Sequence, residues 1–193
     1  MTTILATAQE LVERGLAASS ADDCMVIVRE STSANLRWAN NTLTTNGVMS
    51  DRGVTVVSFV RKAGGTAAGS VTGSATTPDQ VGGLVAAADA AARDAEPAED
   101  ANELVRDRTS PGWEDPAVPT DVTVYDTVAP ALGEAFRRAG AAGRVLYGFV
   151  DHEITTTYLG SSTGLRLRHV QPTGHFACTA KNAALTNSAW VGT

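Results

Sequence analysis

The chain has 193 residues, of which 43% are hydrophobic and 19% are charged, and its formal net charge is -6. This length suits one large domain or two small ones, and the balance of apolar and charged residues excludes a disordered chain. An acidic chain without a cluster of Lys and Arg binds phosphate backbones poorly, so we expect no nucleic-acid partner.

No apolar run approaches the roughly 20 residues that span a bilayer. The start of the chain, MTTILATAQELVERG, lacks the basic region of a secretory signal. We therefore expect a cytoplasmic protein without membrane contact. Cys24 and Cys178 are the only cysteines, and both lie in apolar, strand-like segments. In that compartment two buried, reduced thiols are favoured over a disulfide.

The first segment with helical periodicity covers residues 4–18. We expect an amphipathic helix here, and Thr3 can cap its start. The apolar side of this helix is formed by Leu5, Ala8, Leu11, Val12 and Leu16. Two strands are expected next. The β-branched run over 24–30 predicts a strand buried on both faces. Over 34–40, Leu36 and Trp38 alternate with residues that can face solvent, which predicts a strand with one packed face.

Turn signals divide the β-rich stretch that follows. Asn-Asn at 40–41, Asn-Gly at 46–47 and Gly-Gly at 64–65 are typical of tight turns. After the second of these signals we expect a strand over 53–61, and after the third a returning strand over 66–71. Short turns between apolar runs favour antiparallel hairpins over crossovers through a helix.

A second helix is expected over 78–94, because Pro78 suits a first helical turn and Thr77 can cap it. Its apolar stripe consists of Val81, Leu84, Val85, Ala88 and Ala92. Residues 95–122 hold four of the seven prolines and many acidic residues. They predict an irregular connection, which Trp113 attaches to the body of the protein.

A third helix is expected over 127–140, and only β-structure follows it. The apolar side of this helix consists of Val128, Leu132, Ala135, Phe136 and Ala139. The β-structure begins with one long strand over 144–162. After a turn at 163–164, two further strands are expected over 164–170 and 174–184.

These elements predict the α+β class, with antiparallel sheets of hairpins and helices packed on one face. The order of helix, strands and hairpins occurs from residue 4 and again from residue 127, which is consistent with two αβ units related by duplication. We divide the chain into an amino-terminal α+β unit over 1–96, an irregular connection over 97–122, and a second helix-plus-strands unit over 123–193. Its last segment, LTNSAWVGT, has no terminator, so we expect the second unit to be truncated at its C-terminal end.

Three stretches of this sequence resemble the start of TldD/PmbA-family proteins. They are VIVRESTSANLRWANNTLTTNGV, GVTVVSFVRKAGGTAAGS and the later TTTYLGSSTGLRLRH. The family was once called modulators of DNA gyrase and is now regarded as metallopeptidase subunits. The likeness covers nearly the whole chain, as the amino-terminal domain of such a protein. The leucine-arginine-tryptophan-alanine-asparagine run is more similar to the PmbA (TldE) branch than to TldD.

The resemblance implies a longer protein whose zinc site lies outside this chain. In TldD-type subunits a HExxxH helix and a further cysteine bind zinc in the carboxy-terminal half, and TldE-type partners generally lack this motif. The two subunits form a heterodimer that trims modified or unfolded peptides. The resemblance therefore implies zinc and metallopeptidase activity for the full complex, no cofactor in this chain, and a TldD-type partner or self-association.

Two patterns contain possible metal ligands but fit other roles better. His152-Glu153 begins like a zinc-peptidase motif, yet no second His follows one helical turn later and the run is β-branched, so we expect a surface polar pair. His169, His175 and Cys178 are close in sequence, but strand alternation places His175 and Cys178 on opposite faces. We therefore expect no metal site in this chain.

Two further patterns predict turns rather than chemistry. The segment AGGTAAGS lacks the GK[ST] ending of a phosphate-binding loop. Ser161 and Ser162 lack the surrounding glycines of a nucleophile elbow. Ser, Thr and Gly at these places are typical turn residues. We therefore assign no catalytic residue.

Arg37, Asn40, Asn41 and Asn46 form the candidate substrate-binding cluster. An arginine on the open face of a strand, followed by asparagines that can hydrogen-bond to a backbone, could hold a peptide or a carboxylate. Turn asparagines beside a solvated arginine are the alternative interpretation.

The leading functional hypothesis is an amino-terminal, non-catalytic scaffold and peptide-enclosing domain of a TldD/PmbA-type zinc metallopeptidase subunit. Such a subunit acts in the proteolysis of peptides or unfolded proteins, with an extended peptide at a sheet edge or in a cleft. The alternative is a stand-alone protein-interaction domain that binds partners through exposed β-edges without catalysis. A small-molecule-binding α+β domain is a third hypothesis.

Overall fold

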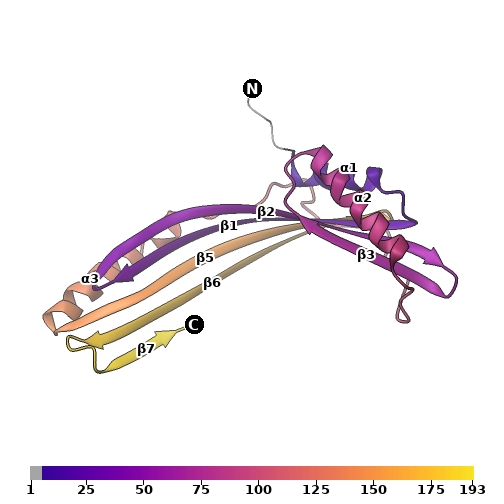
Figure 1. Cartoon of the computed structure of the whole chain (residues 1–193). Coiled ribbons are helices and arrows are strands. Elements are labelled where there is room, and N and C mark those ends of the chain that lie inside the picture. The colour runs from indigo at the N-terminus through magenta and orange to yellow at the C-terminus, as the bar shows by residue number, and fades with distance from the viewer. Residues whose placement is uncertain (1–5) are drawn as a thin grey trace. The chain divides into compact units, whose positions relative to one another are not determined.

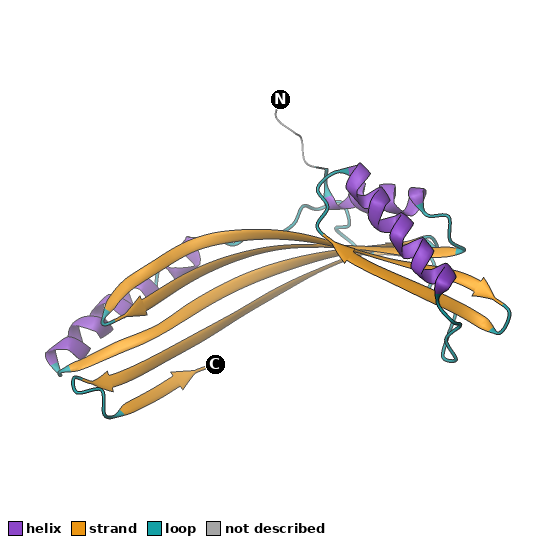
Figure 2. Ribbon diagram, in the orientation of Figure 1, coloured by secondary structure: helices purple, strands orange, loops and turns teal. Residues whose placement is uncertain are grey.

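The computed structural model describes residues 6–193. In this part of the chain helices accompany a mainly antiparallel sheet, which confirms the predicted α+β class. The helices are α1 (Ala8–Ala18), α2 (Pro78–Asp94) and α3 (Val128–Ala141), with a 3-10 turn η1 (Val122–Tyr125) before α3 (Figure 1). The strands are β1 (Asp23–Ala39), β2 (Thr42–Lys62), β3 (Gly65–Gly73), β4 (Arg108–Thr109), β5 (Arg144–Ser161), β6 (Leu165–Asn182) and β7 (Ser188–Gly192) (Figure 2).

The strands lie in the order β3-β2-β1-β5-β6-β4, and β7 pairs with β6. β2 and β3 form an antiparallel hairpin, from Val54 opposite Gly73 to Lys62 opposite Gly65. β7 is likewise antiparallel to β6. The short strand β4 is the exception, because it runs parallel to β6. The hairpin architecture expected from the turn signals is therefore confirmed, with β4 as an addition.

The long strands are more continuous than the sequence predicted. The expected strands over 24–30 and 34–40 are both part of β1, and those over 164–170 and 174–184 both belong to β6. The turn predicted at 46–47 is wrong, because β2 continues through it. Pairing with a long neighbouring strand supplies backbone hydrogen bonds along β2, and these outweigh the local preference of Asn-Gly for a turn.

Burial along the first part of β1 also differs from the prediction. Cys24, Val26 and Val28 are buried, whereas the residues between them are half-buried. The expectation of a strand buried on both faces is therefore wrong, and this strand packs mainly one face. The alternation expected around Leu36 and Trp38 is confirmed, because both side chains are buried and Arg37 between them is exposed.

α1 begins at Ala8, four residues after its predicted start. Thr7 caps it: Glu10 N donates to Thr7 Oγ1 (3.1 Å), and Thr7 N donates to Glu10 Oε2 (2.8 Å). This reciprocal capping box satisfies two backbone N–H groups and fixes the helix start. The predicted cap Thr3 and the apolar residue Leu5 lie outside the described residues.

α2 has the predicted bounds, and α3 begins one residue later than predicted. At the end of α2, Lys62 Nζ donates to Arg93 O (2.6 Å) and Ala95 O (2.5 Å), so a cation satisfies carbonyls that the helix leaves free. α3 is followed by Gly143, whose φ of 62° reverses the chain. None of the helices among the described residues combines the length and the apolar character that crossing a membrane requires.

The chain divides into two compact units, each with its own contacts. Unit 1 consists of the chain up to Glu30, Asp51–Ala117 and Thr156–Val170. Unit 2 consists of Ser31–Ser50, Val118–Thr155 and Gln171–Thr193. Neither unit is one continuous stretch, because β1, β2, β5 and β6 contribute residues to both. The sequence division at 96 and 123, and the duplication, stay predictions.

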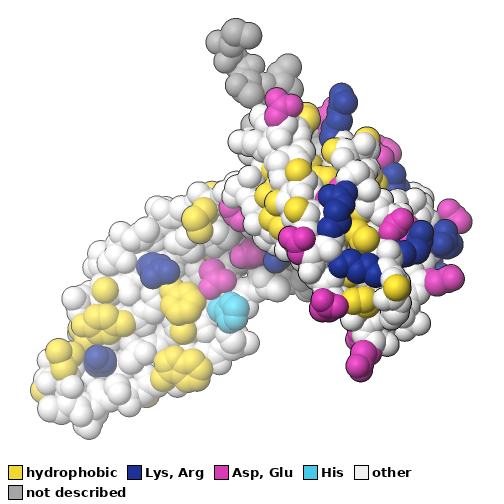
Figure 3. Space-filling model, turned by 45° about the vertical axis from the view of Figure 1, so that its right-hand side comes forward, with side chains coloured by type: hydrophobic (Ala, Val, Ile, Leu, Met, Phe, Trp, Pro, Cys, Tyr) yellow, Lys and Arg dark blue, Asp and Glu magenta, His cyan; other side chains and the backbone are white. Residues whose placement is uncertain are grey.

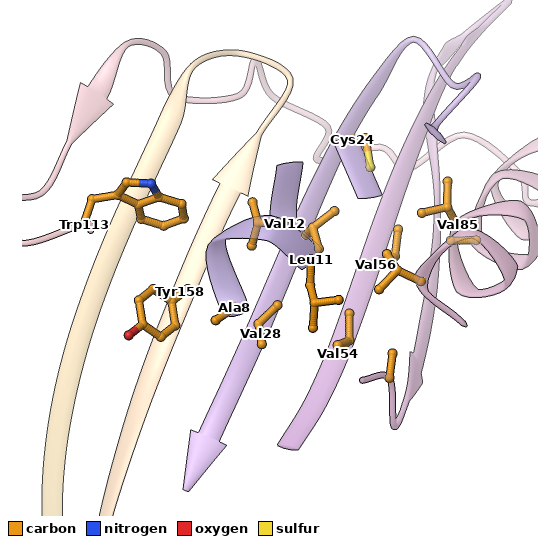
Figure 4. Packing of buried hydrophobic residues seen from close by; sticks show 14 residues of the cluster. Ala8, Leu11, Val12, Cys24, Val28, Val54, Val56, Val85, Trp113 and Tyr158 are labelled. Atoms are coloured by element: carbon orange, nitrogen blue, oxygen red, sulfur yellow. The ribbon is translucent and has the colours of Figure 1, made fainter. Parts of the chain in front are cut away.

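The core of unit 1 forms where α1 and α2 cover valines of β1 and β2 (Figure 4). Leu11 and Val12 of α1 and Val85 of α2 are almost completely buried against these valines, and each such side chain stabilises the fold by about 1.5–3 kcal/mol. Trp113 packs edge-on against Tyr158, with ring centroids 5.8 Å apart. The expected attachment of the irregular connection through Trp113 is confirmed. The buried valines are Val26, Val28, Val54 and Val56.

Both cysteines are free thiols. Cys24 is buried in the core of unit 1, as its apolar surroundings predicted, and this burial raises the pKa of the thiol. Cys178 is half-buried in β6. A thiol with a raised pKa is less often ionised and is therefore less reactive.

Gly69 of β3 lets α2 approach the sheet closely. A Cβ atom on this residue would lie 2.5 Å from Ala88 O, which belongs to the backbone of α2. Real Cβ atoms do not approach a carbonyl oxygen so closely, and a helix backbone cannot turn aside as a flexible side chain can. The glycine therefore sets the distance between α2 and β3.

Asp89 is a charged residue on the buried side of α2, with 2% of its surface exposed. The carboxylate accepts hydrogen bonds from Ser58 Oγ (2.5 Å), Ser19 Oγ (2.9 Å) and Ser20 N (2.7 Å). Burial alone raises the pKa of this carboxyl, but the hydrogen bonds outweigh burial and hold the pKa below its usual range. The carboxylate thus links α2 to β2 and to the segment after α1.

Replacing Asp89 with Ala is expected to destabilise the protein by about 2–4 kcal/mol, because the buried Ser58 hydroxyl loses its acceptor. The pKa of Asp89 is lowered on folding, so its ionised form contributes stability above the unfolded pKa of about 3.9. This contribution is lost as the pH falls through the folded pKa. Urea unfolding of both proteins should show a large difference at pH 7 and a smaller one under strongly acidic conditions.

Asp94→Ala is the control for this prediction, because Asp94 is exposed on the same helix. Its effect should stay within about 0.5 kcal/mol. Equal losses in the Asp89 and Asp94 variants would contradict a special role of the buried carboxylate.

Gly69→Ala is expected to destabilise the protein by about 1–3 kcal/mol, because the new methyl group forces α2 away from β3. Gly83→Ala on α2 is the matched variant, since a Cβ atom there meets no heavy atom within 4 Å. It should stabilise the protein by about 0.5–1 kcal/mol, because alanine lowers the conformational entropy of the unfolded chain. Thermal unfolding followed by circular dichroism measures both changes, and shifts in the same direction would contradict the packing argument.

Candidate functional site

All four candidate residues lie in unit 2. Arg37 is exposed in β1, Asn40 and Asn41 form the turn between β1 and β2, and Asn46 is exposed within β2. The hydrogen bonds among the described residues join Asn40 and Asn41 to β5, but none of them involves the Asn46 side chain. Arg37 contacts the same strand through the Phe149 ring, so three of the four candidates contact β5.

The Asn40-Asn41 turn is anchored on β5. Both residues have positive φ, 51° and 59°, which Asn tolerates and which is typical of a two-residue hairpin turn. Asn41 Nδ2 donates to Arg144 O (2.8 Å), and Leu146 N donates to Asn41 Oδ1 (2.8 Å). Tyr147 OH donates to Asn40 Oδ1. The predicted turn is confirmed, and its two side-chain amides bond to the fold itself.

One face of the unit 2 sheet is covered by α3 and η1. Trp38 of β1 packs against Phe136 of α3, with ring centroids 6.4 Å apart, and against Phe176 of β6 at 5.9 Å. Tyr125 of η1 is buried and its OH donates to Ala34 O (2.5 Å). Burial raises the pKa of this tyrosine, so it stays protonated and keeps donating.

The alternate residues of the same strands point to the opposite face. Arg37 of β1 lies over the Phe149 ring of β5, with its Cζ atom 5.9 Å from the ring centroid. Lys181 of β6 lies over the Tyr147 ring of β5, with Nζ 5.3 Å from the centroid. Tyr147 and Phe149 are two residues apart in one strand, so both cations lie on the same side of the sheet.

Two further pairs extend this face. His175 Nδ1 of β6 lies 3.5 Å from Asp151 Oδ2 of β5. Trp190 of β7 pairs with Thr179 of β6 and is 67% exposed, and partners across an antiparallel pair have side chains on one face. Figure 3 shows hydrophobic and basic side chains near a histidine and an acidic side chain on the surface of unit 2. We call this surface the open face, formed by Arg37, Tyr147, Phe149, Asp151, His175, Lys181 and Trp190.

The open face presents cations that aromatic rings hold in place. A cation that is already positioned over a ring loses less side-chain freedom when it binds an anion. The guanidinium of Arg37 can also form two parallel hydrogen bonds with one carboxylate. Phe149 and Trp190 add exposed apolar surface beside these charges. The arrangement suits an extended peptide that carries carboxylates next to apolar side chains.

The three histidines lie in two neighbouring strands, His152 in β5 and His169 and His175 in β6. His152 and Glu153 lie in β5, as the β-branched run predicted. They are half-buried, and His152 Nδ1 is 2.8 Å from Thr120 Oγ1, so the pair is less exposed than a pair fully in solvent. His175 belongs to the open face, and Cys178 lies on the other side of β6. Among the described residues no three His, Cys, Asp or Glu side chains could hold a metal ion together.

The glycine-rich and serine-rich segments form turns. Residues 63–64 connect β2 to β3, one position before the predicted Gly-Gly turn, and Gly65 opens β3. Between β5 and β6, the hydroxyl groups of Ser161 and Thr163 are hydrogen-bonded to each other (2.7 Å). Thr163 Oγ1 also donates to Val105 O (2.7 Å). The turn chemistry predicted for both segments is confirmed.

Most of the open face could not be predicted from the sequence. Tyr147 and Phe149 alternate with Leu146 and Val150, so β5 is apolar on both sides and shows no contrast in polarity. Lys181 joins Tyr147 only because β6 pairs with β5. Two sequence features could have indicated this face. Tyr147 and Phe149 are two residues apart, and a turn follows β5 that makes β5 and β6 neighbours.

Solved structures with the same fold include TldE from Thermococcus kodakarensis, which is 16% identical in sequence with a TM-score of 0.66 over 97% of this chain and 42% of that chain. A protein described as a modulator of DNA gyrase from Thermotoga maritima is 16% identical, with a TM-score of 0.60 over 96% of this chain and 42% of that one. Another from Bacteroides thetaiotaomicron is 11% identical, with a TM-score of 0.59 over 96% and 43%. This chain spans about two fifths of the length of these structures.

A family model covers the first part of the chain. Residues 24–95 match PmbA/TldA metallopeptidase domain 1, while no curated protein sequence matches the chain. The matched residues include two of the three stretches in which the family resemblance was found, VIVRESTSANLRWANNTLTTNGV and the glycine-rich hairpin after it. Over residues 24–95 this match confirms the resemblance to the first domain of TldD/PmbA-family proteins, and the solved structures share the fold of the chain.

Proposed function

We propose that this chain is the amino-terminal, non-catalytic scaffold and peptide-enclosing domain of a TldD/PmbA-type zinc metallopeptidase subunit, on the PmbA (TldE) branch. The subunit would act in the cytoplasm, in the proteolysis of peptides or unfolded proteins, with a TldD-type partner or a second copy. The match of residues 24–95 to the family's first domain supports the metallopeptidase setting. The fold shared with a TldE protein supports the choice of branch.

The open face is the observation that carries the peptide-holding role. Arg37 and Lys181 each lie over an aromatic ring, and Trp190 exposes two thirds of its surface beside them. Exposed aromatic and arginine side chains in one place are typical of binding surfaces. A peptide lying along this face would place its carboxylates at the two cations and its apolar side chains on the rings.

We assign hydrolysis to residues outside this chain. The residues of the described part do not fit a zinc site, and the chain spans about two fifths of the length of its TldE relative. Zinc would therefore be held by another part of the complete protein or by its partner. The open face would bind and orient the peptide, which raises its effective concentration at catalytic groups elsewhere.

A stand-alone interaction domain is the second candidate function. It is favoured by β2, because β3 pairs only with Val54–Lys62 and the earlier part of β2 keeps one free edge among the described residues. Free edges of this kind pair with strands of other proteins without any catalysis. Peptide binding at the open face would favour the scaffold function, whereas a partner bound at the edge alone would favour this second candidate.

The open face should bind acidic peptides. We expect a fluorescent peptide of alternating Glu and Phe to bind the full chain more tightly than the same peptide with Lys in place of Glu. Combined replacement of Arg37 and Lys181 with Ala should weaken binding of the acidic peptide by about tenfold or more, since each charge-assisted contact is worth about 1.5–3 kcal/mol. Fluorescence anisotropy measures both comparisons.

Arg137→Ala is the control for peptide binding, because Arg137 is an exposed arginine on α3, away from the open face. It should leave the affinity unchanged. Equal affinity for the acidic and basic peptides, or equal losses in all variants, would contradict the assignment of the open face.

The purified chain should contain far less than one zinc ion per molecule and should show no peptidase activity. The reason is geometric, because His175 and Cys178 are on opposite faces of β6 and cannot share one ion. Elemental analysis after dialysis against zinc measures the stoichiometry. One zinc per chain that is lost in a combined His169→Ala and His175→Ala variant would contradict the assignment.

A further inference from the structure

Four alternate side chains of β5 form a row along the open face. In a strand, side chains two residues apart lie on the same side, about 6.5–7 Å from one another. Tyr147, Phe149 and Asp151 of the open face have this spacing, and Glu153 continues the series within β5. The four residues together span about 20 Å. We call them the β5 row.

The first half of the β5 row carries positive charge. Lys181 Nζ lies 5.3 Å from the centroid of the Tyr147 ring, and Arg37 Cζ lies 5.9 Å from that of the Phe149 ring. The two cations come from β6 and β1, the strands on either side of β5. Neither forms an ion pair with an acidic side chain of the described residues. Their charge is therefore available to an anion above the two rings.

The second half of the β5 row carries negative charge. Asp151 Oδ2 lies 3.5 Å from His175 Nδ1, and 32% of the Asp151 side chain is exposed. The imidazole offsets this charge only when it is protonated. Glu153 Oε1 accepts a hydrogen bond from Thr155 Oγ1 (2.9 Å), a neutral group that leaves the charge of the carboxylate in place. The row therefore changes sign between Phe149 and Asp151.

We propose that the open face selects peptides by charge order, with two acidic residues followed at alternate positions by two basic residues. This inference rests on the proposed peptide-holding function and adds the class of peptide that the face selects. An extended peptide has the same two-residue period as β5, so four alternate side chains of one peptide can each lie above one member of the β5 row. Either chain direction satisfies this order, because only the side-chain charges are matched.

The order of the charges matters more than their sum. Exposed ion pairs are individually weak, so selection requires several contacts in register. In a peptide with interleaved charges, two of the four side chains meet a charge of their own sign, and such repulsion is a common source of specificity. Neighbours in the β5 row are closer than the screening length of about 10 Å at 0.1 M salt, so each half of the row acts as one block of charge.

Two peptides of identical composition test this inference. The block peptide is Glu-Ser-Glu-Ser-Lys-Ser-Lys, and the interleaved peptide is Glu-Ser-Lys-Ser-Glu-Ser-Lys, both with blocked termini and no net charge. The full chain should bind the block peptide about threefold to tenfold more tightly at low salt. Fluorescence anisotropy of labelled peptides measures both affinities. The difference should shrink at 0.5 M salt, on the order of which screening acts within a few ångströms.

The combined variant Asp151→Asn and Glu153→Gln removes the negative half of the β5 row and keeps the size of both side chains. It should bind the two peptides equally, and it should bind an all-acidic peptide, Glu-Ser-Glu-Ser-Glu-Ser-Glu, more tightly because a repulsion is lost. Glu134→Gln is the matched control, since Glu134 is an exposed acid on α3, which covers the opposite face of the sheet. It should keep the preference for the block peptide. Circular dichroism checks that both variants are folded.

Two results would overturn the charge order and leave the peptide-holding role in place. One is equal affinity of the unchanged chain for the block and interleaved peptides while the all-acidic peptide still binds. The other is a preference for the block peptide that persists in the Asp151 and Glu153 variant. Failure of all three peptides to bind the unchanged chain would instead contradict the peptide-holding function, and the charge order with it.

Discussion

The Asn40-Asn41 turn is the constraint on which unit 2 depends. Two successive residues in the left-handed region give a turn whose twist matches that of the strands beside it. The amide of Asn41 then bonds to β5 as a strand backbone would, so β1 is fixed in register with its neighbours. Because side chains alternate along a strand, this register sends Trp38 toward α3 and Arg37 toward the open face. A slip of one residue would exchange the two faces.

In unit 1 the same alternation gathers the valines of β1 and β2 on one side, where α1 and α2 cover them. Apolar contact alone would let a helix shift along the sheet. Gly69 limits how α2 can approach, and Asp89 adds hydrogen bonds of fixed direction to Ser19, Ser20 and Ser58. A buried carboxylate is costly to desolvate. Once its hydrogen-bond partners are present, however, it favours one position of α2 over positions that are shifted along the sheet.

Features determined by neighbouring residues could be predicted from the sequence, and features determined by distant strands could not. The bounds of α2 follow from Thr77, Pro78 and an apolar stripe that are adjacent in the chain. The turn predicted at 46–47 does not form, because pairing with the distant strand β1 keeps β2 extended through this local turn signal. The open face depends on which strands become neighbours, and no local pattern places Lys181 over Tyr147. The resemblance to the family could be found because it lies in short, contiguous runs of sequence.

The three tryptophans lie in three different environments. Trp38 is enclosed by aromatic rings on the covered face of unit 2, Trp113 is buried against Tyr158 in unit 1, and Trp190 is exposed on β7. An indole shielded from water emits at shorter wavelength than a solvated one. The fluorescence of variants that each keep a single tryptophan would therefore report separately on unit 1, on unit 2, and on the binding of a molecule to the open face. The chain carries its own fluorescent probes, with no label required.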